Sequence, residues 1–159
     1  MNITRTHEDQ ANRMHTRAEH IIEWLAAHKH WVLDAERSGE FNHLLSTFPW
    51  TTSHIRWSSV PHTRIELSDD AASETFWEQF RTTPVGRHQY VFLMYAAHEP
   101  GIVCSARDAL PDLDLLYSGA PGPRYFCGAD LQDGHPKLRF TDFAEYDGLD
   151  LVRAYVPGV

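Results

Sequence analysis

Residues 89–95 constrain the fold more than any other part of the chain. Their sequence, Gln-Tyr-Val-Phe-Leu-Met-Tyr, carries apolar or aromatic side chains at every position after the first. Successive side chains of a strand point to opposite faces of its sheet, so this segment needs packed cover on both faces. We therefore predict a central strand at these positions, with other elements layered on either side of its sheet.

Further strands are predicted where apolar and polar residues alternate between turn signals. The segment 62–67, His-Thr-Arg-Ile-Glu-Leu, has the period of a half-buried strand. The sequence Asp-Leu-Gln-Asp-Gly at 130–134 predicts a turn rather than a calcium loop, because it lacks the alternate-position acids of that motif. The other predicted strands are 51–57, which would pair with 62–67 as a first hairpin, and then 102–106, 113–117, 124–127 and 149–156.

Helical periodicity is concentrated in the first part of the chain. Apolar residues at steps of four and three predict a long amphipathic helix from about residue 8 to residue 37, ended by Ser38-Gly39. A short second helix is predicted at residues 40–48. The capping side chains at residues 68–70 predict the start of a third helix, which Pro84 helps to end.

This order of elements predicts an α+β fold with N-terminal helices packed on a mostly antiparallel, curved meander sheet. The order is similar to that of the cone-shaped domain of the nuclear-transport-factor-2-like superfamily, and this similarity of element order implies a curved sheet. A chain of 159 residues has the length of one domain. Residues 1–159 are therefore predicted to form a single α+β domain.

Negative charge is unevenly distributed along the chain. The net charge is −8, and residues 69–159 hold 14 Asp and Glu against 7 Lys and Arg. Nucleic-acid binding depends on clustered cationic side chains, and no such cluster is present in the sequence. The composition argues against a nucleic-acid partner and favours a basic protein partner.

The leading functional hypothesis is a non-catalytic, cytoplasmic protein-binding module with an acidic recognition surface. In composition the chain resembles small acidic inhibitors of cationic enzymes, including immunity proteins, and an assembly factor would be equally consistent. Carboxylates gathered on one surface would steer a basic partner toward it. The candidate partner-binding residues are Asp108, Asp112, Asp114, Asp130 and Asp133.

Two alternatives follow from other features. The chain contains none of the common nucleophile, phosphate-binding or dinucleotide-binding motifs, so whether it is an enzyme stays open. A curved sheet could still enclose an apolar pocket in which a His, Tyr or Asp acts as an acid or base. Its candidate residues are Tyr90, Phe92, Tyr117, Asp142 and Arg153. The second alternative is a structural subunit of a larger assembly, for example a viral one, which would allow a homo-oligomer.

Histidine and cysteine give no metal or cofactor prediction. The chain has 11 His, but the pairs on the predicted first helix, such as His20 with Glu23, have no matching pair on a second helix. Cys104 and Cys127 lie in apolar surroundings typical of small buried residues, although a single bridge between neighbouring strands is an alternative. The polar N-terminus and the absence of a long apolar run predict a cytoplasmic protein without a membrane segment.

Overall fold

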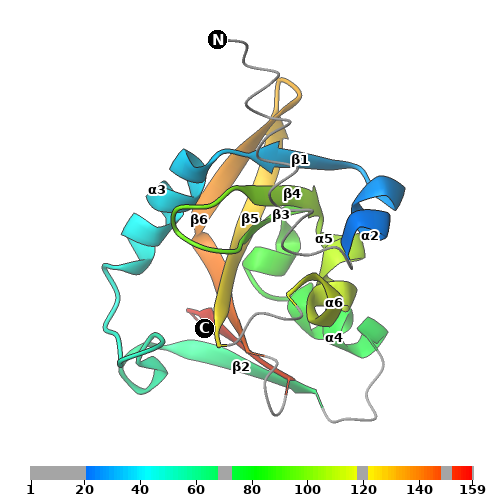
Figure 1. The fold of residues 1–159 in the computed structure, drawn as a ribbon. Helices are drawn as coiled ribbons and strands as arrows, with labels where there is room; N and C mark the ends of the chain where they lie inside the picture. The colour runs from blue at the N-terminus through cyan, green and yellow to red at the C-terminus, as the bar shows by residue number, and fades with distance from the viewer. Residues whose placement is uncertain (1–20, 68–72, 118–121, 148–151, 159) are drawn as a thin grey trace.

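A single antiparallel sheet of seven strands organises the molecule. The computed structural model describes residues 21–67, 73–117, 122–147 and 152–158. The strands follow the order β1-β4-β3-β5-β6-β7-β2, and the sheet is curved and open (Figure 1). This confirms the predicted α+β class. The strands are β1 His30–Leu33, β2 His62–Leu67, β3 Tyr90–Met94, β4 Gly101–Ser105, β5 Arg124–Gln132, β6 His135–Asp147 and β7 Val152–Pro157.

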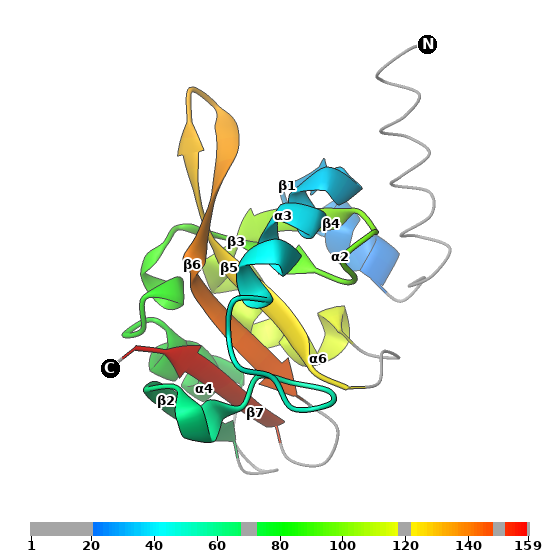
Figure 2. The same ribbon diagram turned by 90° about the vertical axis from the view of Figure 1, so that its left-hand side faces the viewer.

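Helices lie on both faces of the sheet. Figures 1 and 2 show α2, α4, α5 and α6 on one face and α3 on the other. No helix in the described parts of the chain has the length and apolar character needed to cross a membrane. The helices are α2 Ile22–Ala27, α3 Ala35–Leu45, α4 Ser73–Phe80, α5 Ala106–Ala109 and α6 Leu113–Leu116, with 3₁₀ turns η2 Trp57–Ser59, η3 Val85–Arg87 and η4 Leu110–Asp112.

Strand β3 lies inside the sheet between β4 and β5, as its apolar sequence predicts. Val91 and Leu93 belong to the core under α4, α5 and α6, which we call the helical core. Phe92 and Met94 belong to the core on the opposite face, which we call the aromatic core. All four side chains are buried. One strand therefore supplies both cores, because its side chains alternate between the two faces.

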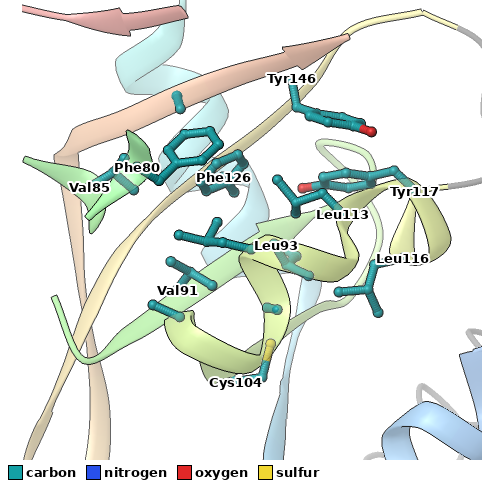
Figure 3. Packing of buried hydrophobic residues seen from close by; sticks show 14 of the residues in the cluster. Phe80, Val85, Val91, Leu93, Cys104, Leu113, Leu116, Tyr117, Phe126 and Tyr146 are labelled. Atoms are coloured by element: carbon teal, nitrogen blue, oxygen red, sulfur yellow. The ribbon is translucent and has the colours of Figure 1, made fainter. Parts of the chain in front are cut away.

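The helical core is packed by rings from distant parts of the chain. Phe80 of α4 contacts Phe126 of β5 edge-on, with ring centroids 5.6 Å apart. Tyr117 stacks on Tyr146 at 5.8 Å, and Figure 3 shows the two rings lying side by side. The hydroxyl of Tyr117 donates to the carbonyl oxygen of Tyr125 at 3.2 Å, so its polar end is satisfied inside the core.

The aromatic core is centred on α3. Phe41 is fully buried and contacts Phe92, Phe140 and Phe143, with ring centroids 5.7–6.3 Å apart. Asp34 caps the start of the helix, where its side chain accepts a hydrogen bond from the backbone N–H of residue 37 at 3.3 Å. The cap fixes where the helix begins, and Phe41 fixes which face it buries.

The predicted long first helix is wrong within the described residues. Helix α2 ends at Ala27, His28 has extended backbone (φ −129°, ψ 139°), and β1 follows at His30. Trp31 and Val32 continue the apolar spacing of a helix, but they lie opposite residues of β4 in the sheet. Pairing with β4 overrides the local pattern here, because strand formation depends on the partner strand. The part of this prediction before residue 21 lies outside the described residues.

Two further predictions of secondary structure are wrong. Residues 51–57 form no strand beyond one bridge between Trp50 and Ile55, and β2 pairs with β7 instead of with this segment. Residues 113–117 alternate like a strand but form α6, because Leu113 and Leu116, three residues apart, both reach the helical core. The predicted strand at 149–156 begins outside the described residues, and within them β7 covers Val152–Pro157.

Strands β5 and β6 extend beyond the sheet as a two-stranded arm, which we define as residues 130–137 (Figure 2). Asp133 (φ 55°) and Gly134 (φ 81°) form its two-residue turn, which confirms the predicted turn. Such a turn closes a hydrogen-bonded pair, here Gln132 with His135, so the nitrogen of Pro136 faces the open edge. A proline at that position removes no bond from the ladder.

Candidate functional site

Three of the five predicted partner-binding aspartates lie on consecutive turns of α5, η4 and α6. We call Asp108, Asp112 and Asp114 the acidic ridge. Asp108 and Asp114 are exposed. Asp112 is half-buried and accepts a hydrogen bond from Nε1 of Trp24 at 2.8 Å, which ties α2 to the ridge. Among the described residues, none of the three forms an ion pair.

The other two predicted aspartates lie on the arm. Asp130 is bonded to Arg139 at 2.8 Å and to His88 at 2.9 Å, so two cationic groups offset its charge. Asp133 occupies the exposed turn at the arm's tip. Figures 1 and 2 both show the arm pointing away from α6. The structure therefore divides the predicted acidic set into a ridge and an arm.

His88 joins three segments at the root of the arm. Its Nδ1 lies 2.9 Å from Oδ1 of Asp130, and its Nε2 lies 2.6 Å from Oδ2 of Asp142. The ring packs on Gly128, where an added Cβ would lie 2.2 Å from the ring carbon Cδ2. Glycine at position 128 is therefore what allows the ring to approach the strand.

The two carboxylates change the acidity of His88. Burial opposes the charged imidazole, but the hydrogen bonds that its ring donates to Asp130 and Asp142, together with the negative charges of these residues, outweigh burial and raise the pKa of His88 above 6.5. The hydrogen bonds that Asp130 accepts from His88 and from Arg139 lower the pKa of Asp130 below its ordinary value. The cluster therefore favours a charged imidazolium between charged carboxylates.

The five predicted pocket residues do not converge on one face. Phe92 lies in the aromatic core with Tyr90 packed against it, whereas Tyr117 lies in the helical core. Asp142 is bonded to His88 at the root of the arm. Nε of Arg153 lies 3.7 Å from Glu66 on β2.

A buried carboxylate lies elsewhere in the aromatic core. Glu145 is 2% exposed and accepts hydrogen bonds from Nε1 of Trp57 and from the hydroxyl of Tyr125, each at 2.5 Å. The backbone N–H of Ile55 donates to the same hydroxyl at 3.3 Å. Residues 55–57, β5 and β6 thus meet at one acid, and no cation within the described residues forms an ion pair with it.

The environment of Glu145 favours its neutral form. Burial raises the pKa of this carboxyl above 4.5, and the hydrogen bonds from Tyr125 and Trp57 only partly offset the effect. Burial also raises the pKa of Tyr125, and the adjacent charge of Glu145 adds to this shift. A carboxyl group with a raised pKa beside a phenol is a pair that can hold or transfer a proton.

Several of the other described histidines make structural contacts, and both cysteines are buried. His28 stacks on Trp24 at 4.0 Å and donates its Nδ1–H to the carbonyl oxygen of that residue at 2.8 Å. Cys104 and Cys127 lie in different cores, and both thiols are free. No group of three metal-ligating side chains occurs in the described segments. Of the predicted His20–Glu23 pair, His20 lies outside the described residues.

Sequence reasoning did not identify the His88 and Glu145 clusters, although each leaves a trace. Gly128 interrupts an otherwise apolar strand, which is typical of a close approach by another group. Glu145 follows Phe143 at the spacing of one strand face, so it is an acid in line with a core ring. Neither trace identifies the partner side chain, because the partners lie 20 to 88 residues away.

No protein-family model matches the chain. No curated protein is significantly similar to it in sequence.

Proposed function

We propose that this protein is a protein-binding module that recognises a basic partner through the acidic ridge. The observation that carries the proposal is the set of three aspartates on α5, η4 and α6 without a cationic partner among the described residues. Arg107 is the one cation in the segment 106–117. Uncompensated surface charge of this kind attracts and orients an oppositely charged protein.

The arm contributes less to this recognition than its sequence suggests. The charge of Asp130 is offset by His88 and Arg139, and Lys137 lies opposite it in the ladder. Asp133 is left as the exposed acid of the turn. We therefore assign the basic partner to the ridge and not to the arm.

The ridge is tested by changing charge without changing shape. The triple variant Asp108→Asn, Asp112→Asn and Asp114→Asn removes three charges, and the amide oxygen introduced at position 112 can still accept from Trp24. A matched control, Glu36→Gln, Glu66→Gln and Glu78→Gln, removes three exposed charges elsewhere. Proteins captured from the native lysate by the wild type and by both variants are compared by mass spectrometry. We expect a basic protein that the wild type and the control retain and the ridge variant loses.

Association kinetics with that basic protein give the sharper readout. At low salt the ridge variant should associate about tenfold more slowly than the wild type, and the difference should shrink as added salt screens the charges. Equal association rates for the ridge variant and the control at low salt would contradict the proposal.

A second candidate function is supported by Glu145. Its raised pKa and its bond to Tyr125 fit an acid–base pair of a small-molecule enzyme or binder. This candidate predicts a metabolite that co-purifies with the native protein and is identified by mass spectrometry after denaturation. It also predicts that Tyr125→Phe weakens retention of that metabolite. Purified protein without any bound metabolite would leave the acidic ridge as the better-supported site.

A further inference from the structure

The arm leaves the sheet two residues beyond a break in strand register, and His88 lies beside that break. Pairing between β5 and β6 skips residues 140–142 at the step from Cys127 to Gly128. A bulge of this kind bends its strand, and Figure 2 shows the arm diverging from the sheet there. An isolated two-stranded ribbon is only marginally stable, so contacts at its root decide how firmly it is held.

His88 makes two of these contacts. Its bond to Asp130 reaches the arm itself, and its bond to Asp142 reaches the bulge. The imidazole side chain is 17% exposed, and each carboxylate is about one-third exposed. The ring therefore joins the loop before β3 to both strands at the point where the arm begins.

The number of protons on His88 decides how many of these bonds exist. An ionised carboxylate only accepts hydrogen bonds, so each bond needs an N–H on the ring. The imidazolium has two N–H groups, whereas neutral imidazole has one and presents a lone pair at its other nitrogen. We propose that His88 is a proton-operated clip: the imidazolium ties the arm to the bulge, and loss of one proton releases a carboxylate and loosens the arm.

The surrounding charges define the pH range in which the clip is closed. Burial opposes the imidazolium, the two aspartates favour it, and the net effect raises the pKa of His88. A raised pKa means that the stabilisation is complete below the unfolded value and is lost as pH rises through the folded value. Asp130 has a lowered pKa, so its contribution is lost only as pH falls below its ordinary value of 3.8. The charged groups bonded to the ring are Asp130 on β5 and Asp142 on β6, and Arg139 on β6 is bonded in turn to Asp130.

Two variants separate this clip from a simple packing role, because they should act in opposite directions. In Asp142→Asn the amide can donate to the bare nitrogen of neutral His88, so the arm should stay held at high pH. In His88→Gln the side chain is neutral at every pH, and its two N–H groups are on a single nitrogen, whereas Asp130 and Asp142 lie at different nitrogens of the ring, so the arm should be loose throughout. A packing role alone would not make one variant tighter and the other looser at high pH.

Hydrogen exchange of the arm amides, followed by mass spectrometry from about pH 5 to about pH 9 and corrected for intrinsic rates, measures the effect. Wild-type protection of residues 130–137 should fall as pH rises. The fall should be about tenfold for each unit by which the pKa of His88 differs between the closed and open arm. Asp142→Asn should stay protected at high pH, and His88→Gln should be weakly protected at all pH values.

Controls distinguish loosening of the arm from general unfolding. Peptides from β3 and β4 should keep their protection in every variant, and His135→Gln, which changes an exposed histidine on the same arm, should keep the wild-type pH profile. The proposal is overturned if wild-type arm protection does not change with pH, or if His88→Gln keeps the wild-type profile. If His88→Gln does not fold, the result for Asp142→Asn tests the proposal. The proposal is also overturned if the arm of Asp142→Asn loses as much protection at high pH as the arm of the wild type.

Discussion

Glu145 is a carboxylate whose stabilising partners are neutral. Trp57 and Tyr125 satisfy both of its oxygens, but burial still raises its pKa. Folding therefore favours the protonated form of this residue. The stability that protonation contributes is complete below the unfolded pKa near 4.5 and is lost as pH rises through the higher folded value.

This residue gives a prediction about stability against pH. Glu145→Gln removes the titration, so the free energy of unfolding of the wild type should fall relative to the variant as pH rises above the ordinary value of 4.5. The fall should be about 1.4 kcal/mol for each unit of pKa shift. Urea unfolding followed by tryptophan fluorescence at several pH values measures it.

The prediction concerns how the difference in the free energy of unfolding between wild type and variant changes with pH. A cost of the substitution that is the same at every pH therefore does not affect it. Glu36→Gln, at an acid whose side chain is 73% exposed, is the matched control and should differ from the wild type by the same amount at every pH. A difference between wild type and Glu145→Gln that stays constant with pH would show that the buried carboxyl does not titrate in this range.

Helix α3 illustrates how one capping residue and one ring place an element. Asp34→Ala removes the acceptor for the backbone N–H of residue 37 and should lower the free energy of unfolding by about 1 kcal/mol. Asp34→Ser restores a capping oxygen and should recover most of this loss. Thermal unfolding of both variants checks the prediction, and an equal loss in both would mean that the cap does not stabilise the helix.

Elements with a complete local pattern are the ones that the sequence predicts correctly. The strand at 89–95 has apolar residues on both faces, and the return through residues 98–101 is a strong turn signal, so β3 and β4 form as expected. The pattern of residues 30–33 is compatible with both helix and strand. This segment forms a strand because it pairs with β4, some 70 residues later, and a local sequence pattern contains no information about that partner.

The candidate sites also divide into those formed by residues close in sequence and those formed by residues distant in sequence. Asp108, Asp112 and Asp114 were chosen from the sequence as acids that lie close together in the chain, but the helical turns that carry them were not predicted, because residues 113–117 alternate like a strand. The clusters around His88 and Glu145 were not predicted, because each joins segments that are distant in the chain. Their geometry depends on the bulge in β6 and on the segment 55–57, neither of which has a sequence signature of its own.

At the scale of the whole molecule, the last strand completes the sheet. Strand β7 lies between β6 and β2, and its Ala154 and Val156 are buried in the helical core. A chain that ends at Asp147 should lose the cooperative unfolding transition. Burial of Val156 alone contributes about 2 kcal/mol, and β2 would also lose its whole ladder.

Tryptophan fluorescence during urea unfolding tests this truncation. A chain that ends at Pro157 keeps all of β7 and should retain the full transition, which makes it the control. A truncated chain that unfolds with the wild-type midpoint would mean that β7 is dispensable for the core.

The pairing of β2 with β7 also matters while the chain is being synthesised. The partner of β2 follows about 90 residues later, which at ordinary translation rates corresponds to roughly 5 to 20 s. During that interval the β2 backbone has no strand to bond with, and the apolar face around Ile65 is uncovered. Newly made chains should therefore depend on chaperones until β7 has left the ribosome and can pair with β2. Folded molecules should not depend on them.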